Sequence, residues 1–160
     1  MFDTEGGWGN GTQMDAETQS AWLARWYLLQ AGLRSTLNLQ MAAWFTWCDP
    51  ATFHWGTIET DAGAPNETGV AFNQVYSWLV GAVMSRPCSA APDGTWSCSI
   101  TRPGNYRAEV LWSQQTSKSY TPDAAFTEYR DLAGSTVKIS KGSQVTIGPK
   151  PILLETAPGP

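Results

Sequence analysis

The sequence predicts an α/β fold joined to an all-β part. A partial (β/α)-barrel segment is expected over residues 1–86, followed by a small antiparallel β-sandwich over residues 87–160. Two helical patterns, at about residues 15–31 and 69–85, each follow a strand-like segment, and this alternation is typical of the β/α units that build barrels. After Pro87 the sequence changes to short β-rich segments separated by turn residues, which is typical of a sandwich.

The first β/α unit begins with a short strand that ends near Glu5, before the glycine-rich turn Gly6-Gly7-Trp8-Gly9. Asp15 is a suitable N-cap for the helix that follows. Apolar residues recur at helical spacing up to about Ala31, and Gly32 is expected to stop the helix.

The second unit begins with a near-continuous apolar run over residues 36–47, which predicts a buried parallel strand. Residues 48–68 form a long loop, and loops of this length in compact domains are usually functional or disordered. The second helix is expected over residues 69–85, because Arg86-Pro87 is a strong helix stop.

Short β-rich segments follow at 96–102, 106–113, 126–131, 136–140, 144–147 and 152–155. Within the second of them, alternation places Tyr106, Ala108, Val110 and Trp112 on one face. Because this face is largely apolar, we expect it to lie in the core.

Composition excludes some classes of partner. The net charge is −4 and the ten basic residues are scattered, which argues against nucleic acid. No window is apolar enough for a membrane span. The chain has one His, no phosphate-binding loop and no metal-ligand spacing, so no cofactor and no metal are expected. Nine Trp residues suit either core packing or a flat, partly polar ligand such as a sugar.

The three cysteines divide into a pair and a single residue. Cys88 and Cys98 flank a turn-rich segment, and a disulfide between them would stabilise the fold by about 2.5–3 kcal/mol. Cys48 would remain free. A disulfide favours an extracellular or periplasmic location for the parent protein, although no signal peptide is present, which suggests that an N-terminal part is missing.

The candidate site lies where the two predicted parallel strands end, because catalytic residues of β/α barrels occupy that edge. Glu5 ends the first strand, and aromatic residues follow both strands. The expected sugar-binding side chains are Trp8, Trp44, Trp47, His54 and Trp55. A solvated loop position for His54 is an equally good interpretation, and Asp3 would share the face of Glu5 if the strand continued regularly.

Two segments resemble a known family. Thr4-Glu5-Gly6-Gly7-Trp8 is similar to the seventh-strand nucleophile segment of retaining glycoside hydrolases of the large (β/α)8-barrel clan. Trp44-Phe45-Thr46-Trp47-Cys48-Asp49 is similar to the eighth strand of the same barrels, where an aromatic residue lies beneath the sugar. The resemblance extends over about the first 85 residues, and a final helix followed by a small β-sandwich is also a familiar ending in that clan.

The resemblance implies that Glu5 is the nucleophile of a retaining hydrolase, that Trp47 or Trp44 stacks on the sugar, and that His54 bonds sugar hydroxyls or orients Glu5. It also implies a second carboxyl group from an earlier strand, preceded by Asn. The only Asn-Glu pair, Asn66-Glu67, lies in the late loop, and six of the eight strands have no counterpart. We therefore expect the chain alone to be inactive, and to associate with the missing barrel portion or with itself.

Two alternatives remain open from the sequence. The β-rich part could be a carbohydrate-binding module that presents Trp96, Tyr106 and Trp112 to a polysaccharide. It could also be a purely structural module that stiffens a barrel.

Overall fold

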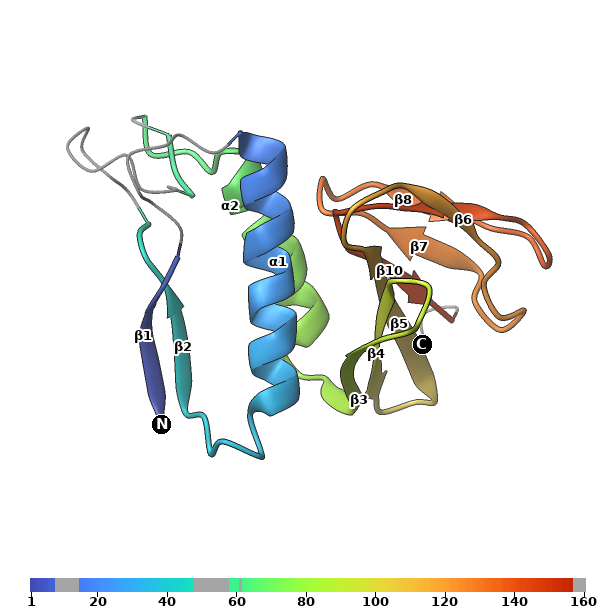
Figure 1. Cartoon of the computed structure of the whole chain (residues 1–160), viewed down its shortest axis with the longest axis horizontal. Coiled ribbons are helices and arrows are strands. Elements are labelled where there is room, and N and C mark those ends of the chain that lie inside the picture. Colours follow the sequence, from blue (N-terminus) through green and yellow to red (C-terminus); the bar gives the residue numbers. More distant parts are fainter. Residues whose placement is uncertain (8–14, 48–57, 61, 157–160) are drawn as a thin grey trace.

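The computed structural model describes residues 1–7, 15–47, 58–60 and 62–156, and Figure 1 shows their arrangement. The barrel-like part consists of β1 (Phe2–Gly6), α1 (Ala16–Leu33), β2 (Met41–Trp44) and α2 (Glu67–Leu79). The β-rich part follows with β3 (Val83–Ala90), β4 (Thr95–Arg102), β5 (Tyr106–Ser113), β6 (Lys118–Tyr120), β7 (Glu128–Arg130), β8 (Thr136–Lys138), β9 (Val145–Ile147) and β10 (Ile152–Glu155).

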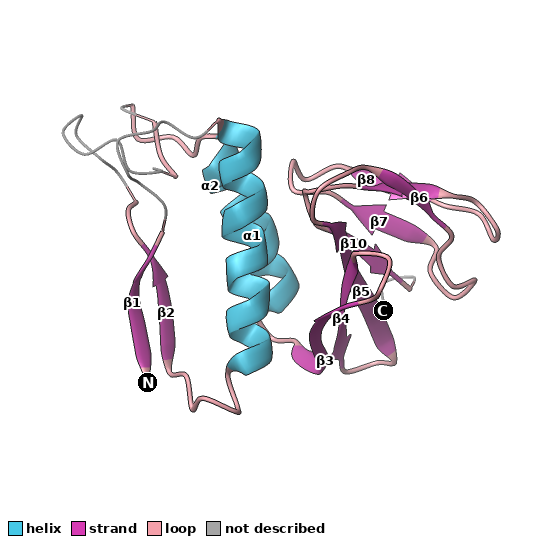
Figure 2. Cartoon of the chain, in the orientation of Figure 1, coloured by secondary structure: helices cyan, strands magenta, loops and turns pink. Residues whose placement is uncertain are grey.

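The elements form layers with the helices between two sheets (Figures 1 and 2). β1 and β2 pair in parallel as a two-stranded sheet on one side of α1. On the other side lies a six-stranded antiparallel sheet in the order β3-β4-β5-β10-β7-β8. The antiparallel pair β6-β9 contributes to a second cluster of buried side chains on the far face of that sheet. The predicted combination of a partial barrel and an antiparallel β-sandwich is therefore confirmed.

Side-chain caps begin both helices. The Asp15 carboxylate accepts a hydrogen bond from the Thr18 N–H at 2.7 Å, as the sequence predicts. Asn66 does the same for the Gly69 N–H at 2.9 Å. The predicted stop at Gly32 is wrong, because α1 continues to Leu33. Gly32 instead permits close approach of β3, since a Cβ there would lie 3.3 Å from Met84 Sδ.

The second half of the chain departs from the sequence prediction near Pro87. The helix expected up to Ser85 ends at Leu79, where Gly81 adopts the left-handed φ of 74° and the chain turns back as β3. Pro87 lies within β3 and not after a helix. A proline is tolerated there because β3 is an edge strand of its sheet. The predicted boundary between residues 86 and 87 falls inside this strand.

The strand expected over residues 36–47 is shorter than predicted. Residues 34–38 form turns, and Asn38 has the left-handed φ of 48°, so the parallel strand begins only at Met41. The sequence does not predict β6, because Ser117-Lys118, at its beginning, is typical of a turn.

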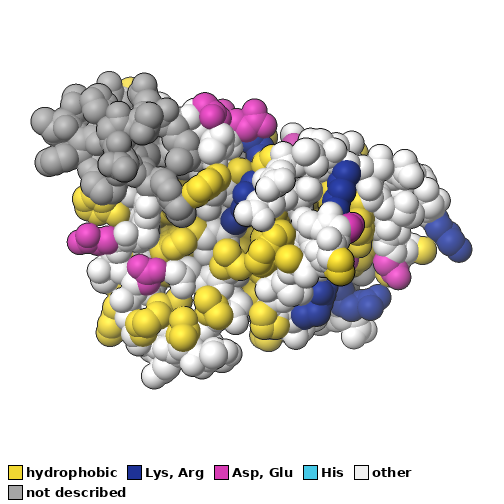
Figure 3. All heavy atoms as spheres, in the orientation of Figure 1, with side chains coloured by type: hydrophobic (Ala, Val, Ile, Leu, Met, Phe, Trp, Pro, Cys, Tyr) yellow, Lys and Arg dark blue, Asp and Glu magenta, His cyan; other side chains and the backbone are white. Residues whose placement is uncertain are grey.

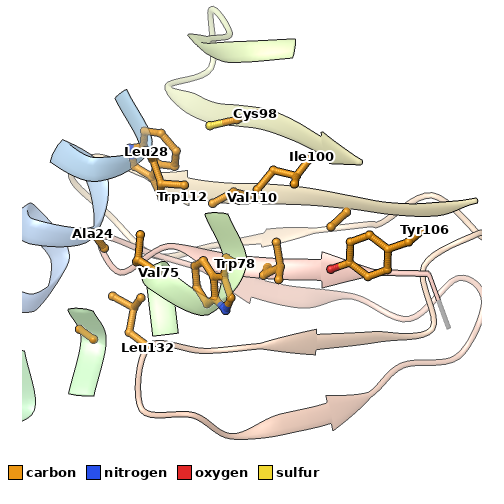
Figure 4. Close-up of a cluster of buried hydrophobic side chains, with 13 residues drawn as sticks. Ala24, Leu28, Val75, Trp78, Cys98, Ile100, Tyr106, Val110, Trp112 and Leu132 are labelled. Atoms are coloured by element: carbon orange, nitrogen blue, oxygen red, sulfur yellow. The ribbon is translucent and has the colours of Figure 1, made fainter. Parts of the chain in front are cut away.

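Alternate side chains of β5 lie in the main core (Figure 4). Its members come from both helices, from the six-stranded sheet and from the turn after β7: Ala24, Leu28, Ala71, Val75, Trp78, Cys98, Ile100, Tyr106, Ala108, Val110, Trp112, Leu132 and Leu153. The predicted inward face of β5 is therefore confirmed. Leu111 points to the opposite face, where it joins the second cluster with Ile147 and Leu154. Because this cluster contains side chains from both helices and from the sheet, the two parts of the chain pack against each other through it.

The predicted disulfide between Cys88 and Cys98 is present. It joins the neighbouring strands β3 and β4 with a Cα–Cα distance of 4.2 Å. Cys48 lies outside the described residues.

Candidate functional site

Glu5 lies exposed near the carboxyl end of β1. Asp3 pairs with Ala42 and Gly6 pairs with Trp44, so two residues of β1 oppose one residue of β2 at this point. Such a bulge re-aims side chains and is frequent next to active sites. It means that Glu5 does not follow the regular alternation that the sequence pattern assumed.

Asp3 has a different environment from Glu5. Its carboxylate is half-buried toward α1 and accepts a hydrogen bond from Gln30 Nε2 at 2.5 Å. Asp3 therefore helps to attach β1 to the helix layer. Asp3 thus binds α1, whereas Glu5 is exposed to solvent.

The two glycines after Glu5 are required by close packing. A Cβ on Gly6 would lie 2.0 Å from Cζ2 of Trp26, and a Cβ on Gly7 would lie 2.1 Å from the Phe45 carbonyl oxygen. The Phe45 N–H also donates to the Gly6 carbonyl at 2.6 Å. These contacts fix the backbone that follows Glu5, so part of the Glu5-Gly6-Gly7 signal is explained by packing.

Trp44 at the end of β2 is buried, with 9% of its surface exposed. It belongs to a hydrophobic cluster with Leu23 and Ile58, and its ring meets that of Trp26 edge-on at 5.8 Å. Its backbone N–H donates to the Tyr27 hydroxyl at 3.2 Å. The ring of Trp44 therefore serves the packing of the strand pair on the helix layer.

Trp47, three residues later, is 54% exposed. Its ring is held edge-on against Phe72 of α2, with 5.9 Å between the ring centroids. Its carbonyl accepts a hydrogen bond from the Ile58 N–H at 3.1 Å, and the Phe45–Thr46 peptide before it is cis. Trp47 thus combines a fixed position with an open ring, as a sugar-stacking residue needs.

The remaining predicted site residues, Trp8, His54 and Trp55, lie outside the described part of the chain. Within the described ranges, no group of three His, Cys, Asp or Glu side chains is placed to hold a metal ion. Neither α1 nor α2 has the length and apolar character of a membrane-spanning helix.

The structure adds a contact that sequence reasoning missed. Arg25 of α1 donates from Nε to the Pro149 carbonyl at 2.8 Å, across 124 residues. In the same loop, Lys150 lies 2.9 Å from Glu67 and 3.9 Å from Glu17, in the first turns of the two helices. The β9–β10 loop thus binds both helices of the barrel-like part. A local sequence pattern cannot predict these contacts, because the residues that make them are far apart in the chain.

Comparisons with known proteins agree with this architecture. The chain is similar in structure to a family 39 glycoside hydrolase from the gut symbiont Bacteroides cellulosilyticus WH2, with a TM-score of 0.75 and 18% identity. The match covers 97% of this chain and 33% of that protein, so the chain spans about a third of its length. No family model and no curated protein matches the sequence.

Two further solved structures are less similar. An α-galactosidase I from Mortierella vinacea matches 90% of this chain and 36% of that one, with a TM-score of 0.48 and 12% identity. A putative α-galactosidase from Bacteroides fragilis NCTC 9343 matches 88% of this chain and 29% of that one, with a TM-score of 0.40 and 11% identity. Because both TM-scores lie below 0.5, neither structure supports a conclusion about this chain. Because the match to the family 39 glycoside hydrolase covers almost all of this chain, the partial barrel and the β-rich part occur together in a glycoside hydrolase fold.

Proposed function

We propose that this chain is the C-terminal portion of a retaining glycoside hydrolase and that Glu5 is its catalytic nucleophile. The observation that carries the proposal is the position of Glu5, exposed near the carboxyl end of a parallel strand. Catalytic residues of β/α barrels occupy that edge. The fold likeness to a family 39 glycoside hydrolase and the segment Thr4–Trp8 support the same assignment.

In this role the Glu5 carboxylate attacks the anomeric carbon of a bound sugar and forms a glycosyl ester as the bond to the leaving-group oxygen breaks. A second carboxyl group, about 5–5.5 Å away, gives its proton to that oxygen and then removes a proton from the water that hydrolyses the ester. Asp3 is poorly suited as this partner because its carboxylate is bound to Gln30. The chain alone is therefore expected to be inactive on unactivated glycosides.

Trp47 is the preferred stacking residue for the sugar, since its ring is open whereas that of Trp44 is buried. Trp8, His54 and Trp55 are proposed as further sugar contacts on the basis of the sequence alone. The substrate class is a carbohydrate with an O-glycosidic bond.

The β-rich part is proposed to be a structural support and not a carbohydrate-binding module. The observation that favours support is the burial of Tyr106 and Trp112 in the core shared with the helices. The disulfide between Cys88 and Cys98 supports an extracellular or periplasmic location.

The assignment of Glu5 is tested with a sugar whose leaving group needs no proton from an acid. The anomeric fluoride of a 2-deoxy-2-fluoro glycosyl fluoride leaves as fluoride ion without protonation, so a carboxylate can form the ester with the sugar even where the acid is lacking. A panel of such sugars is incubated with the chain, and the adduct is located by peptide mass spectrometry. We expect one fluoroglycosyl group on Glu5.

Three variants sharpen this test. Glu5→Gln should lose the adduct, Asp3→Asn should retain it, and Trp47→Ala should slow its formation without moving it. An adduct on another residue, or labelling that persists in Glu5→Gln, would remove Glu5 from the proposed role. Failure of the whole panel to label the folded chain would also count against the proposal.

A further inference from the structure

A groove of about 1000 Å³ opens between the C-terminal ends of the two helices, the first residues of β2 and the start of β3. Small-molecule sites usually have volumes of about 300–1,000 Å³. The groove reaches Met41 at the beginning of β2, whereas Glu5 lies near the carboxyl end of the parallel strand β1. It is therefore separate from the candidate active site.

The groove arises where the chain turns out of α2. α2 ends at Leu79, and Gly81 turns the chain into β3, while α1 extends further in the same direction (Figure 1). β3 then approaches α1 closely at Gly32, where a Cβ would lie 3.3 Å from Met84 Sδ. The last turns of α1 are thus bordered by the turn after α2 on one side and by the start of β2 on the other.

The apolar part of the lining is aliphatic. Its large side chains come from β2, from the residue before β2, from the end of α2 and from β3: Leu39, Met41, Leu79, Val80, Val83 and Met84. Met41, Val80 and Val83 are 45%, 54% and 67% exposed. Figure 3 shows hydrophobic side chains gathered over the lower ends of β1, β2 and α1. Apolar patches of this kind mark binding surfaces.

This lining suits an alkyl chain better than a sugar. Sugars bind best where an aromatic ring presents an open face. Among the described lining residues the only aromatic ring is that of Tyr27, which packs edge-on against Trp26 and Phe72. Its hydroxyl accepts a hydrogen bond from the Trp44 N–H. An alkyl chain needs only the aliphatic surface that the groove offers.

One charge borders the groove. Arg34, at the end of α1, is the only charged residue among the described residues that line it. Its side chain is exposed and forms neither an ion pair nor a hydrogen bond with another described residue. Ser35 follows it in the lining and adds a hydroxyl group. An aliphatic groove with a single unpaired cation is complementary to a ligand with an alkyl chain and one negative charge.

We propose that this groove binds a free medium-chain fatty acid, with the alkyl chain along the aliphatic side chains and the carboxylate at Arg34. The site goes beyond glycoside hydrolysis and does not depend on Glu5. Fluoroglycoside labelling and the test below can therefore fail independently.

The test titrates the whole chain with hexanoate, octanoate and decanoate below their micelle concentrations, followed by calorimetry. We expect one saturable site. Full burial of a methylene group strengthens binding about 4-fold, so about 2- to 4-fold per methylene is expected in an open groove. Decyltrimethylammonium has the same chain as decanoate but a positive head group, and should bind at least about 5-fold more weakly because Arg34 repels it.

Methyl NMR locates the bound chain. Met41 and Met84 both line the groove, so decanoate should shift the signals of both methyl groups in the chain labelled at methionine. The signals are assigned with Met41→Leu and Met84→Leu.

Two variants with matched controls complete the test. Val83→Asp places a negative charge in the groove and should abolish decanoate binding. Val137→Asp should bind normally, because Val137 is also exposed but lies on β8. Arg34→Gln should weaken decanoate about 2- to 5-fold, the range for an exposed ion pair, and Lys141→Gln on an exposed turn should not. Circular dichroism establishes that each variant is folded.

The proposal is overturned by the absence of saturable decanoate binding, by equal binding of decanoate and decyltrimethylammonium, or by unchanged Met41 and Met84 signals. Equal loss of binding in Val83→Asp and Val137→Asp would also overturn it. Binding to anionic lipid vesicles without binding of monomeric decanoate would assign the surface to a membrane and not to a free fatty acid.

Discussion

The indole ring of Trp26 lies directly against the backbone of Gly6, so that a Cβ on Gly6 would fall 2.0 Å from Trp26 Cζ2. Through this contact α1 supports the end of the strand that carries Glu5. Gly6 and Trp26 lie on different elements, and the contact leaves no space for a side chain on Gly6.

Gly6→Ala should destabilise the chain by about 1–3 kcal/mol, because the added methyl group overpacks the contact with Trp26. Urea unfolding followed by circular dichroism measures the change. A double-mutant cycle with Trp26→Leu provides the control, since the shorter side chain removes the clash and should reduce the cost of Gly6→Ala. Equal cost in both backgrounds would show that another contact is responsible.

Arg25→Ala should cost about 1.5–3 kcal/mol, because its charged guanidinium bonds the Pro149 carbonyl at the junction of α1 and the β9–β10 loop. The free energy of unfolding is measured by urea titration, with hydrogen exchange at residues 145–155 as a local readout. Lys141→Ala is a matched control on an exposed turn. If both variants lose the same stability, the Arg25 contact is not the cause.

Tyr106→Phe should lower stability by about 1–3 kcal/mol, because it removes one donor from a buried carboxylate. The Tyr106 hydroxyl donates to Glu155 Oε1 at 2.5 Å, and Glu155 is also bound by Arg130. Burial and this bond raise the pKa of Tyr106 far above its usual value. Tyr76→Phe, on an exposed position of α2, should leave thermal unfolding unchanged.

Reduction of the Cys88–Cys98 disulfide should cost about 2.5–3 kcal/mol on the chain-entropy model for a short loop. Comparison of urea unfolding for the wild type and the Cys88→Ser/Cys98→Ser variant measures it. Thiol titration of the unreduced, denatured protein should give one thiol, from Cys48, and three after reduction. Three thiols before reduction would contradict the pairing.

Asp93 should titrate well below an ordinary aspartate. The Thr95 N–H and then the Lys118 ammonium stabilise its carboxylate and lower its pKa to about 2. Because the folded pKa is depressed, this contribution to stability is present above the unfolded pKa near 3.8 and is lost as the pH falls toward 2. Carboxyl-carbon NMR between pH 5 and 1.5 gives the pKa directly, and Asp93→Asn should weaken the acid dependence of unfolding. An Asp93 midpoint near 3.8 would contradict this.

Several features followed from local sequence. Asp15 and the apolar spacing up to residue 31 predicted α1, because a cap and a helical period are local properties. Alternation from Tyr106 to Trp112 predicted the buried face of β5 for the same reason. The glycine-rich turn after Glu5 predicted that this residue lies at the end of a strand. The error at Pro87 arose because a proline stops a helix but is tolerated in an edge strand, and only the completed sheet makes β3 an edge.

The sequence by itself determined the order of the elements apart from β3 and β6, the disulfide pair and the candidate nucleophile, since each depends on residues close together in the chain. Only the tertiary structure decided which aromatic side chains are open. Trp44 and Trp47 are three residues apart, yet one is buried by α1 and the other is held open against Phe72 of α2. It also decided that Phe2 and Met41 of the paired strands are exposed. Burial depends on what packs against a residue, and those partners lie far away in sequence.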